Sequence, residues 1–192
     1  ISVTDGTIEF IPTTGTVLAD ATNYFITSTA SLGNVLINRA SGSAIVQLTT
    51  GYPLTVLNDL TLSSGDFNAN SQNVSIGGDY SIATGTTYTT GTNTTVFNGT
   101  GTQTFTVDLA SALTLNNLTM TKSAGDVLSM AGSQTAINVS GVLNLTAGTF
   151  DDNGDVITVA GNVYNSGIHI GTGKISLTTA ATVQTIDGGG TF

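Results

Sequence analysis

Apolar and polar residues alternate in short segments along most of the chain, and the segments are separated by glycine, asparagine, aspartate or serine. Residues 60–62 and 113–115 both read LTL, and residues 74–76 read VSI. Residues two apart in a strand share a face, so such segments predict short β-strands with one apolar face. The separating residues tolerate positive φ or form local side-chain turns, which predicts tight corners. No window has apolar residues at helical spacing, so the pattern predicts an all-β protein.

The alternating pattern repeats itself over long stretches. Residues 117–163 match residues 34–80 without a gap at an offset of 83, with nine identities in 47 aligned positions. Residues 1–10 match 88–97 at an offset of 87, and residues 171–186 resemble 92–107. We therefore expect one domain over residues 1–192, made of tandem repeats at about 1–87 and 88–170 and a partial copy at 171–192.

A shorter period lies inside the long repeat. Equivalent strand positions recur every 20–24 residues, at Thr95, Leu118, Val142, Val163 and Val183. Three short strands with tight corners have about this length, so the sequence predicts a parallel β-helix, or β-solenoid, of about nine short coils without a capping helix. One long repeat would then be about four coils. A β-sandwich is the alternative, although it does not require a self-match of this length.

The surface of this protein is expected to consist mainly of hydroxyl and amide groups, with few charged side chains. Charged residues make up 8% of the chain, only three residues are basic, and the net charge is −9. Nucleic acids and anionic membranes require basic patches, so we expect neither as a partner. No apolar run is long enough to span a bilayer, so we expect no membrane insertion. The hydroxyl and amide groups that remain suit close-packed or adhesive contacts.

Both ends of the repeat array are incomplete in this sequence. Unpaired strand edges at such ends are pairing sites. We expect either that neighbouring repeats continue the array or that another copy of the chain covers the ends, with the last coil at 174–192 stacking on the first coil at 1–10. The residues predicted to make this self-assembly contact are Ile1, Val3, Ile8, Phe10, Ile175, Leu177, Ile186 and Phe192.

The repeat also has a family resemblance. It is carried by GTGTQTFTV, LTLNNLTMTKSAGDVLSM, INVSGVLNLTAGTF and NGDVITVAGNV, between residues 99 and 163. These segments resemble the repeats of large bacterial surface proteins, the filamentous-haemagglutinin-like and Bacteroidetes-type repeat adhesins. Units of that family are similar to right-handed parallel β-helices. The resemblance implies secretion, exposure at the cell surface, and a stalk, adhesive or fibre-forming role, and it supplies no catalytic residues.

One loop has the spacing of a calcium site. Asp151, Asn153 and Asp155 alternate as the first oxygen ligands of a calcium loop do, and Gly154 permits a sharp bend. The distal carboxylate of an EF-hand is missing. The alternative is a polar turn whose side chains bond their own backbone. We expect no cofactor other than calcium at this loop.

Catalytic chemistry has few candidates in this sequence. His169 is the only histidine, so neither a repeated Ser–His pair nor a multi-histidine metal site can form. Because it lies between two isoleucines, His169 is expected to face outward from its strand. The aspartates lie mostly one to a corner, without basic partners. We therefore expect that the protein is not an enzyme.

These observations favour an extracellular structural protein at the cell surface. The expected role is a β-solenoid building block of a surface fibre, filament or adhesin stalk, stacking head-to-tail on copies of itself or on adjacent repeats. A carbohydrate- or host-surface-binding adhesin module is the alternative, with surface glycans as partners. A polysaccharide-acting β-helix enzyme is the third hypothesis, and it requires carboxylate side chains that the fold brings close together.

Overall fold

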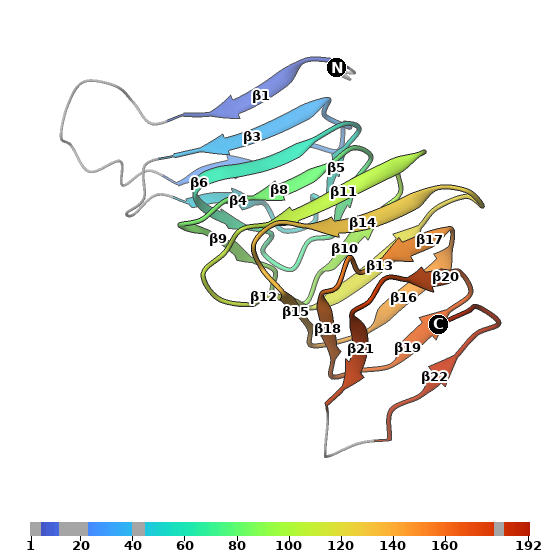
Figure 1. Cartoon of the computed structure of the whole chain (residues 1–192). Helices are drawn as coiled ribbons and strands as arrows, with labels where there is room; N and C mark the ends of the chain where they lie inside the picture. The colour runs from blue at the N-terminus through green and yellow to red at the C-terminus, as the bar shows by residue number, and fades with distance from the viewer. Residues whose placement is uncertain (1–4, 12–22, 40–44, 179–182) are drawn as a thin grey trace.

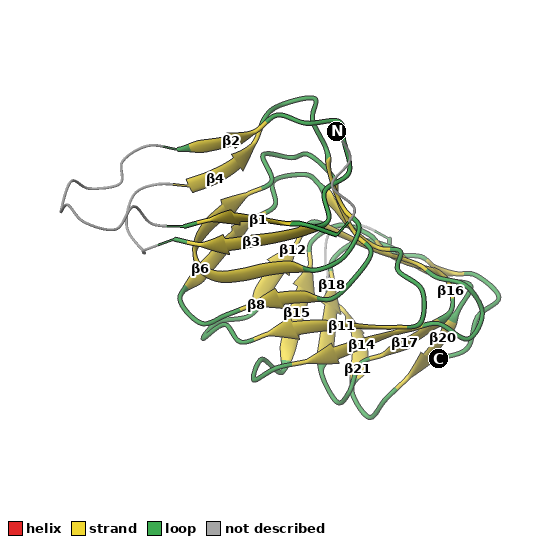
Figure 2. Cartoon of the chain, turned by 90° about the horizontal axis from the view of Figure 1, so that it is seen from above, coloured by secondary structure: helices red, strands yellow, loops and turns green. Residues whose placement is uncertain are grey.

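The computed structural model describes residues 5–11, 23–39, 45–178 and 183–192, and these residues form β-strands and no helix (Figures 1 and 2). No helix in this part of the chain is therefore available to cross a membrane. Neighbouring strands of successive turns pair in parallel, for example β10 (Thr94–Phe97) with β13 (Asn117–Thr121) and β15 (Ala136–Val139) with β18 (Val156–Val159). The predicted parallel β-solenoid is confirmed. The β-sandwich is excluded, because its sheets are antiparallel.

Each turn of the solenoid visits three faces in the same order. The first face consists of β1 (Thr7–Phe10), β3 (Asn34–Asn38), β6 (Leu60–Asn68), β8 (Tyr80–Ile82), β11 (Thr102–Val107), β14 (Val127–Ala131), β17 (Thr149–Asp151) and β20 (Ile168–Ile170). The second face consists of β2 (Tyr24–Ile26), β4 (Ile45–Leu48), the end of β6 and β9 (Thr86–Thr89), followed by β12 (Leu113–Leu115), β15 (Ala136–Val139), β18 (Val156–Val159) and β21 (Lys174–Leu177). The third face consists of β5 (Leu54–Val56), β7 (Val74–Ile76), β10 (Thr94–Phe97), β13 (Asn117–Thr121), β16 (Leu143–Ala147), β19 (Val163–Asn165) and β22 (Ile186–Asp187).

The solenoid has about seven turns instead of the predicted nine. The difference arises because the turns are unequal in length. Thr7 pairs with Asn34, 27 residues later in the chain, whereas Thr149 pairs with Ile168, 19 residues later. Turns of the longer kind reduce the number that a chain of this length can form.

The short period found in the sequence corresponds to one turn. On the third face Thr95 pairs with Leu118, Leu118 with Leu143, Leu143 with Val163, and Val163 with Ile186. This ladder follows the predicted positions to within three residues, since Leu143 and Ile186 take the places of Val142 and Val183. The short period therefore located part of the third face, from β10 to β22, and did not include β5 and β7.

The long repeat, by contrast, is not a whole number of turns. Leu60 lies on the first face, whereas Leu143, its match at the offset of 83, lies on the third. Three turns carry the first face from Leu60 to Met130, through Tyr80 and Phe105, and Leu143 follows two faces later. One long repeat therefore spans three turns and two faces, which is close to the expected four coils but is not a whole number of turns. The sequences of the two copies still match because strands on all three faces have the same pattern. In each strand, apolar residues two apart point inward, and a small residue stands at the corner.

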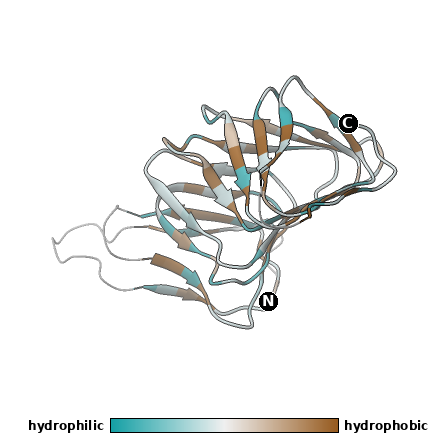
Figure 3. Cartoon of the chain, turned by 90° about the horizontal axis from the view of Figure 1, so that it is seen from below, coloured by the Kyte–Doolittle hydropathy of each residue, from teal (hydrophilic) through white to brown (hydrophobic). Residues whose placement is uncertain are grey.

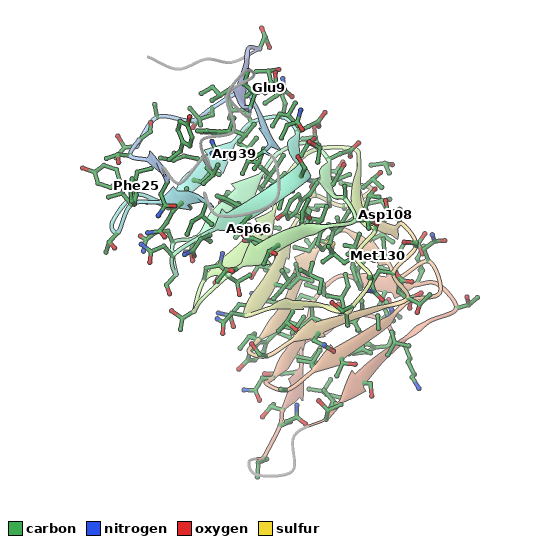
Figure 4. The ribbon with its side chains drawn as sticks, turned by 90° about the vertical axis from the view of Figure 1, so that its left-hand side faces the viewer. Glu9, Phe25, Arg39, Asp66, Asp108 and Met130 are labelled. Atoms are coloured by element: carbon green, nitrogen blue, oxygen red, sulfur yellow. The ribbon has the colours of Figure 1, made fainter. Side chains whose placement is uncertain are left out.

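The interior is a continuous apolar column, and it alternates with polar positions on the outside (Figure 3). The burial pattern of β3 is half-buried and buried in turn, with Val35 and Ile37 inside. In the middle of the column Tyr80 and Phe105 stack with ring centroids 5.1 Å apart, and Phe97 packs at 5.0 Å from Phe105. Met130 belongs to the same column and is labelled in Figure 4. The hydrophobic effect of this column is the main stabilising contribution to the fold.

Corners between faces are tied by side-chain amides. Gln103 Nε2 donates to the carbonyl oxygen of Ile76 at 2.8 Å and also to that of Gly78. Gln184 donates in the same way to the carbonyl oxygens of Val159 and Gly161, at 3.0 and 2.7 Å. Each glutamine thus satisfies carbonyl groups of the preceding turn, where the strand ladder is interrupted.

Candidate functional site

The C-terminal end of the solenoid has an open apolar pocket. It is formed where β20, β21 and β22, the last strands of the three faces, have no further strand beyond them in the described chain (Figure 1). The pocket has a volume of about 350 Å³. Its lining residues are Val163, His169, Ile175, Leu177, Ile186 and Phe192. We call this the end pocket.

Four of the predicted self-assembly residues therefore come together at one place. Ile175, Leu177, Ile186 and Phe192 come from three separate segments and line the same pocket. Leu177 is in register with Val159, which is completely buried, yet Leu177 itself is 38% exposed. Phe192 is 61% exposed. These side chains face the interior of the solenoid, as the core residues do, but no further turn of the described chain covers them.

Ile8 and Phe10, two of the other predicted residues, lie at the opposite end of the solenoid on β1 (Figure 1). Ile8 and Phe10 are half-buried on β1, in register with Val35 and Ile37. The ring of Phe10 meets Tyr24 edge-on, with centroids 6.0 Å apart. Ile1 and Val3 lie outside the described residues. The structure thus divides the six described residues of the predicted set into two clusters, one at each end.

Sequence reasoning placed His169 incorrectly. Its neighbours Ile168 and Ile170 point outward and are 48% and 46% exposed, whereas His169 points inward and lines the end pocket. The expectation of an outward-facing His169 is wrong because β20 pairs in register with β17, which sets His169 above the buried Phe150. The two rings stack with centroids 5.8 Å apart. Only the 19-residue step from Phe150, and not the local Ile-His-Ile pattern, could have revealed this orientation.

Asp152 is the buried partner of His169, and sequence reasoning missed it. The Nε2 atom of His169 lies 2.8 Å from Asp152 Oδ2, a distance typical of a charge-assisted hydrogen bond. The other carboxylate oxygen of Asp152 accepts N–H groups from Gly154 and Gly173, each at 2.9 Å. A Cβ atom at Gly171 would overlap Asp152 Oδ1, so glycine is required there. Asp152 therefore joins the last two turns directly beneath the end pocket.

The candidate calcium loop has the geometry of a turn. Asp151 Oδ1 accepts the N–H of Asn153 at 3.0 Å, and Asn153 has a φ of 50°. Burial raises the pKa of Asp155, and the nearby charge of Asp152 raises it further. Among the described residues no group of three or more His, Cys, Asp or Glu side chains is placed to hold a metal ion. Calcium binding by Asp151, Asn153 and Asp155 stays a prediction.

Comparison with known proteins adds no relative. No family model, no curated protein and no solved structure matches this chain. Its function has to be inferred from the geometry described above.

Proposed function

We propose that this chain is a building block of an extracellular fibre or adhesin stalk at a cell surface. In this proposal the solenoid is continued end to end by another copy of the chain or by adjacent repeats. The observation that carries the proposal is the end pocket, in which core-type residues from three faces lack a covering layer.

Covering the end pocket would be energetically favourable. Burial of apolar surface contributes roughly 25 cal/mol per Å², so the exposed faces of Leu177, Ile186 and Phe192 provide a driving force for association. Among the described residues the outer edges of β21 and β22 have no partner strand, and a further parallel strand would satisfy their backbone groups. The edge of β20 is already partly paired, because the N–H of His169 donates to the carbonyl oxygen of Thr191 at 2.9 Å. The N-terminal cluster of Ile8 and Phe10 supplies apolar residues of the kind that fit.

The proposed role of the rod is mechanical rather than catalytic. Parallel hydrogen-bond ladders on three faces and a continuous apolar column resist bending along the axis. The outside is rich in hydroxyl and amide groups and nearly free of basic residues, a composition that suits lateral contact outside the cell. In this proposal Asp152 and His169 stabilise the last turns and do not act on a substrate.

Carbohydrate binding is the second candidate, because of one ladder on the second face. Phe25 is 60% exposed and lies at the outer edge of the molecule (Figure 4). Its partners in register on the outer surface are Gln47, Asn68 and Thr89. Asn68 Nδ2 donates to Gln47 Oε1 at 3.0 Å. An aromatic ring beside a row of amide and hydroxyl groups is an arrangement on which a sugar chain can stack and form hydrogen bonds.

The test of end-to-end assembly compares two leucine variants. Leu177 in the end pocket and Leu57 at a corner in the body of the solenoid are exposed to 38% and 39%. The wild-type protein should form fibres in negative-stain electron microscopy and gain mass with concentration in analytical ultracentrifugation. Leu177→Lys should shorten or abolish the fibres, because it places a charge in the contact, whereas Leu57→Lys should leave them unchanged.

Two results would count against the proposal. A wild-type chain that stays monomeric at every concentration would contradict self-stacking, and equal loss of fibres in both variants would show that the end pocket is not the contact. Repeating the measurement with and without calcium tests the loop at Asp151, Asn153 and Asp155. Fibres that form only with calcium would establish it as a site.

A further inference from the structure

The second face of the solenoid is interrupted in the middle of the molecule. β9 pairs with β6 but not with β12, and β12 pairs with β15 but not with β9. At the same level the first face is continuous through the pair Tyr80 and Phe105, and the third face through Thr95 and Leu118. The interruption therefore leaves unpaired strand edges in the body of the stack, away from either end.

The interruption has a simple cause in the number of residues between corners. Thr86, the first residue of β9, lies four positions after Ile82, whereas Leu113 lies six positions after Val107, the partner of Ile82. With these extra residues β12 starts later in its turn than β9 does, and the two strands do not pair. The chain bows outward between β11 and β12, and residues 109–112 pass beside β9 in place of a strand (Figure 1).

A groove of about 420 Å³ lies between β9 and the displaced segment. It is lined by Gly85, Thr86, Thr87, Tyr88, Leu109, Ala110, Ser111, Ala112, Leu113 and Thr114. None of these residues is charged and most have small side chains, so another backbone can approach closely. The groove is distinct from the end pocket and does not depend on assembly at the ends.

The hydrogen bonds at the paired edge of β9 and of β12 show which backbone groups of these strands face the groove. Ala69 donates its N–H to the carbonyl oxygen of Thr89 at 2.8 Å, so Thr87 and Thr89 direct their polar groups towards β6. Successive residues of a strand direct them to opposite sides, and the N–H and C=O of Tyr88 therefore face the groove. For β12, the N–H of Ser140 donates to the carbonyl oxygen of Leu115 at 2.9 Å, so Leu115 directs its backbone groups towards β15. By the same rule, the N–H and C=O of Thr114 face the open side of β12.

We propose that this groove binds an extended, uncharged peptide segment of another protein, which adds as a strand beside β9. Backbone hydrogen bonds to Tyr88 would give affinity, as in other cases of strand addition to a sheet edge. β9 has four residues, so a segment of about 13 Å is enough to cover it. The uncharged lining disfavours charged segments, because a charge placed there would lose hydration without gaining a partner. The solenoid thereby carries a lateral protein-docking site in addition to its ends.

The proposal is tested with the blocked peptide acetyl-TVTVT-amide, which is uncharged and alternates β-branched residues. Hydrogen exchange of the intact chain is followed by NMR with and without the peptide. The N–H of Tyr88 should exchange more slowly when the peptide is present. A peptide with N-methylated valines, which lacks part of its backbone donors, should bind about tenfold more weakly.

A pair of tryptophan variants locates the site on the protein. Ser111→Trp places a large ring at the groove and should weaken binding by about tenfold. Thr100→Trp adds the same ring at an exposed turn outside the groove and should leave the affinity within about twofold. Protection confined to β1, β21 or β22, equal binding by both variants, or equal binding of the N-methylated peptide would each overturn the proposal. Failure of the peptide to bind at millimolar concentration would also overturn it.

Discussion

The centre of the solenoid and its C-terminal end have the same inward pattern of apolar residues but different surroundings. Phe105 in the centre is fully buried between Tyr80 and Phe97, whereas Phe192 at the end is 61% exposed. On the second face Val159 is fully buried and its partner Leu177 is 38% exposed. The comparison teaches that burial here is a property of the stack. A residue becomes part of the core only when a further turn is laid over it.

Substitution of the two phenylalanines should show the largest difference. Phe105→Ala removes a ring from the packed column and should lower the free energy of unfolding by about 3–5 kcal/mol. Phe192→Ala should lower that of the monomer by about 0.5 kcal/mol or less, because most of its ring is already in water. Denaturant unfolding at low protein concentration measures both. Similar losses in the two variants would contradict the comparison.

Substitution of two corner glycines, Gly161 and Gly189, by alanine should also cost different amounts of stability, with a smaller difference than for the two phenylalanines. A Cβ atom at Gly161 would overlap the carbonyl oxygen of Gly141 in the preceding turn, so Gly161→Ala should cost about 1–3 kcal/mol. A Cβ atom at Gly189, in the last turn, has no atom within 4 Å, so Gly189→Ala should change stability by about 0.5 kcal/mol or less. Thermal unfolding of the two variants compares the turn beneath the last one, which contains Gly161, with the last turn itself. A large loss in the Gly189 variant would show that the last turn is covered.

The smallest expected effect concerns Asp155, one turn beneath the end pocket. Its folded-state pKa is raised by burial above the value of about 3.9 in an unfolded chain. Folding therefore favours the protonated form, and its contribution to stability is present below the unfolded pKa and lost as pH rises through the folded pKa. Asp155→Asn, which stays neutral, should have a higher unfolding midpoint than wild type at pH 7, and the gain should vanish near about pH 3. A variant that is less stable at pH 7 would favour a charged role for Asp155, such as calcium binding.

Much of the fold could be predicted because it depends on local alternation. The spacing alone gives Thr95, Leu118 and Val163 of the third-face ladder and comes within three residues of Leu143 and Ile186. It also made Ile175 and Leu177 candidate contact residues of the last coil. Gln103 and Gln184 form equivalent hydrogen bonds, and the match of residues 171–186 to 92–107 placed Gln184 within two residues of the position equivalent to Gln103. These features require only that each strand has one apolar face and each corner a residue that satisfies the turn.

What could not be predicted depends on the exact length of each turn. The orientation of His169 is set by a step of 19 residues from Phe150, and an isolated Ile-His-Ile segment gives the opposite answer. The groove beside β9 arises from two extra residues between Val107 and Leu113. The role of Asp152 was not predicted, because its neighbours Asp151 and Asn153 belong to the alternating pattern of a calcium loop and Asp152 does not. Register between turns is a long-range property, and the alternation within a strand does not contain it.

The mismatch between the 83-residue repeat and whole turns has a geometric consequence for any chain built from further copies of it. Each copy advances the chain by three turns and two faces, so equivalent side chains appear on a different face in each successive copy. Side chains at one position of the repeat would therefore follow a helical path around the solenoid axis. They would return to their original face only after three copies. Such a rod would present the same chemistry in every direction around its axis, without any change in the repeated sequence.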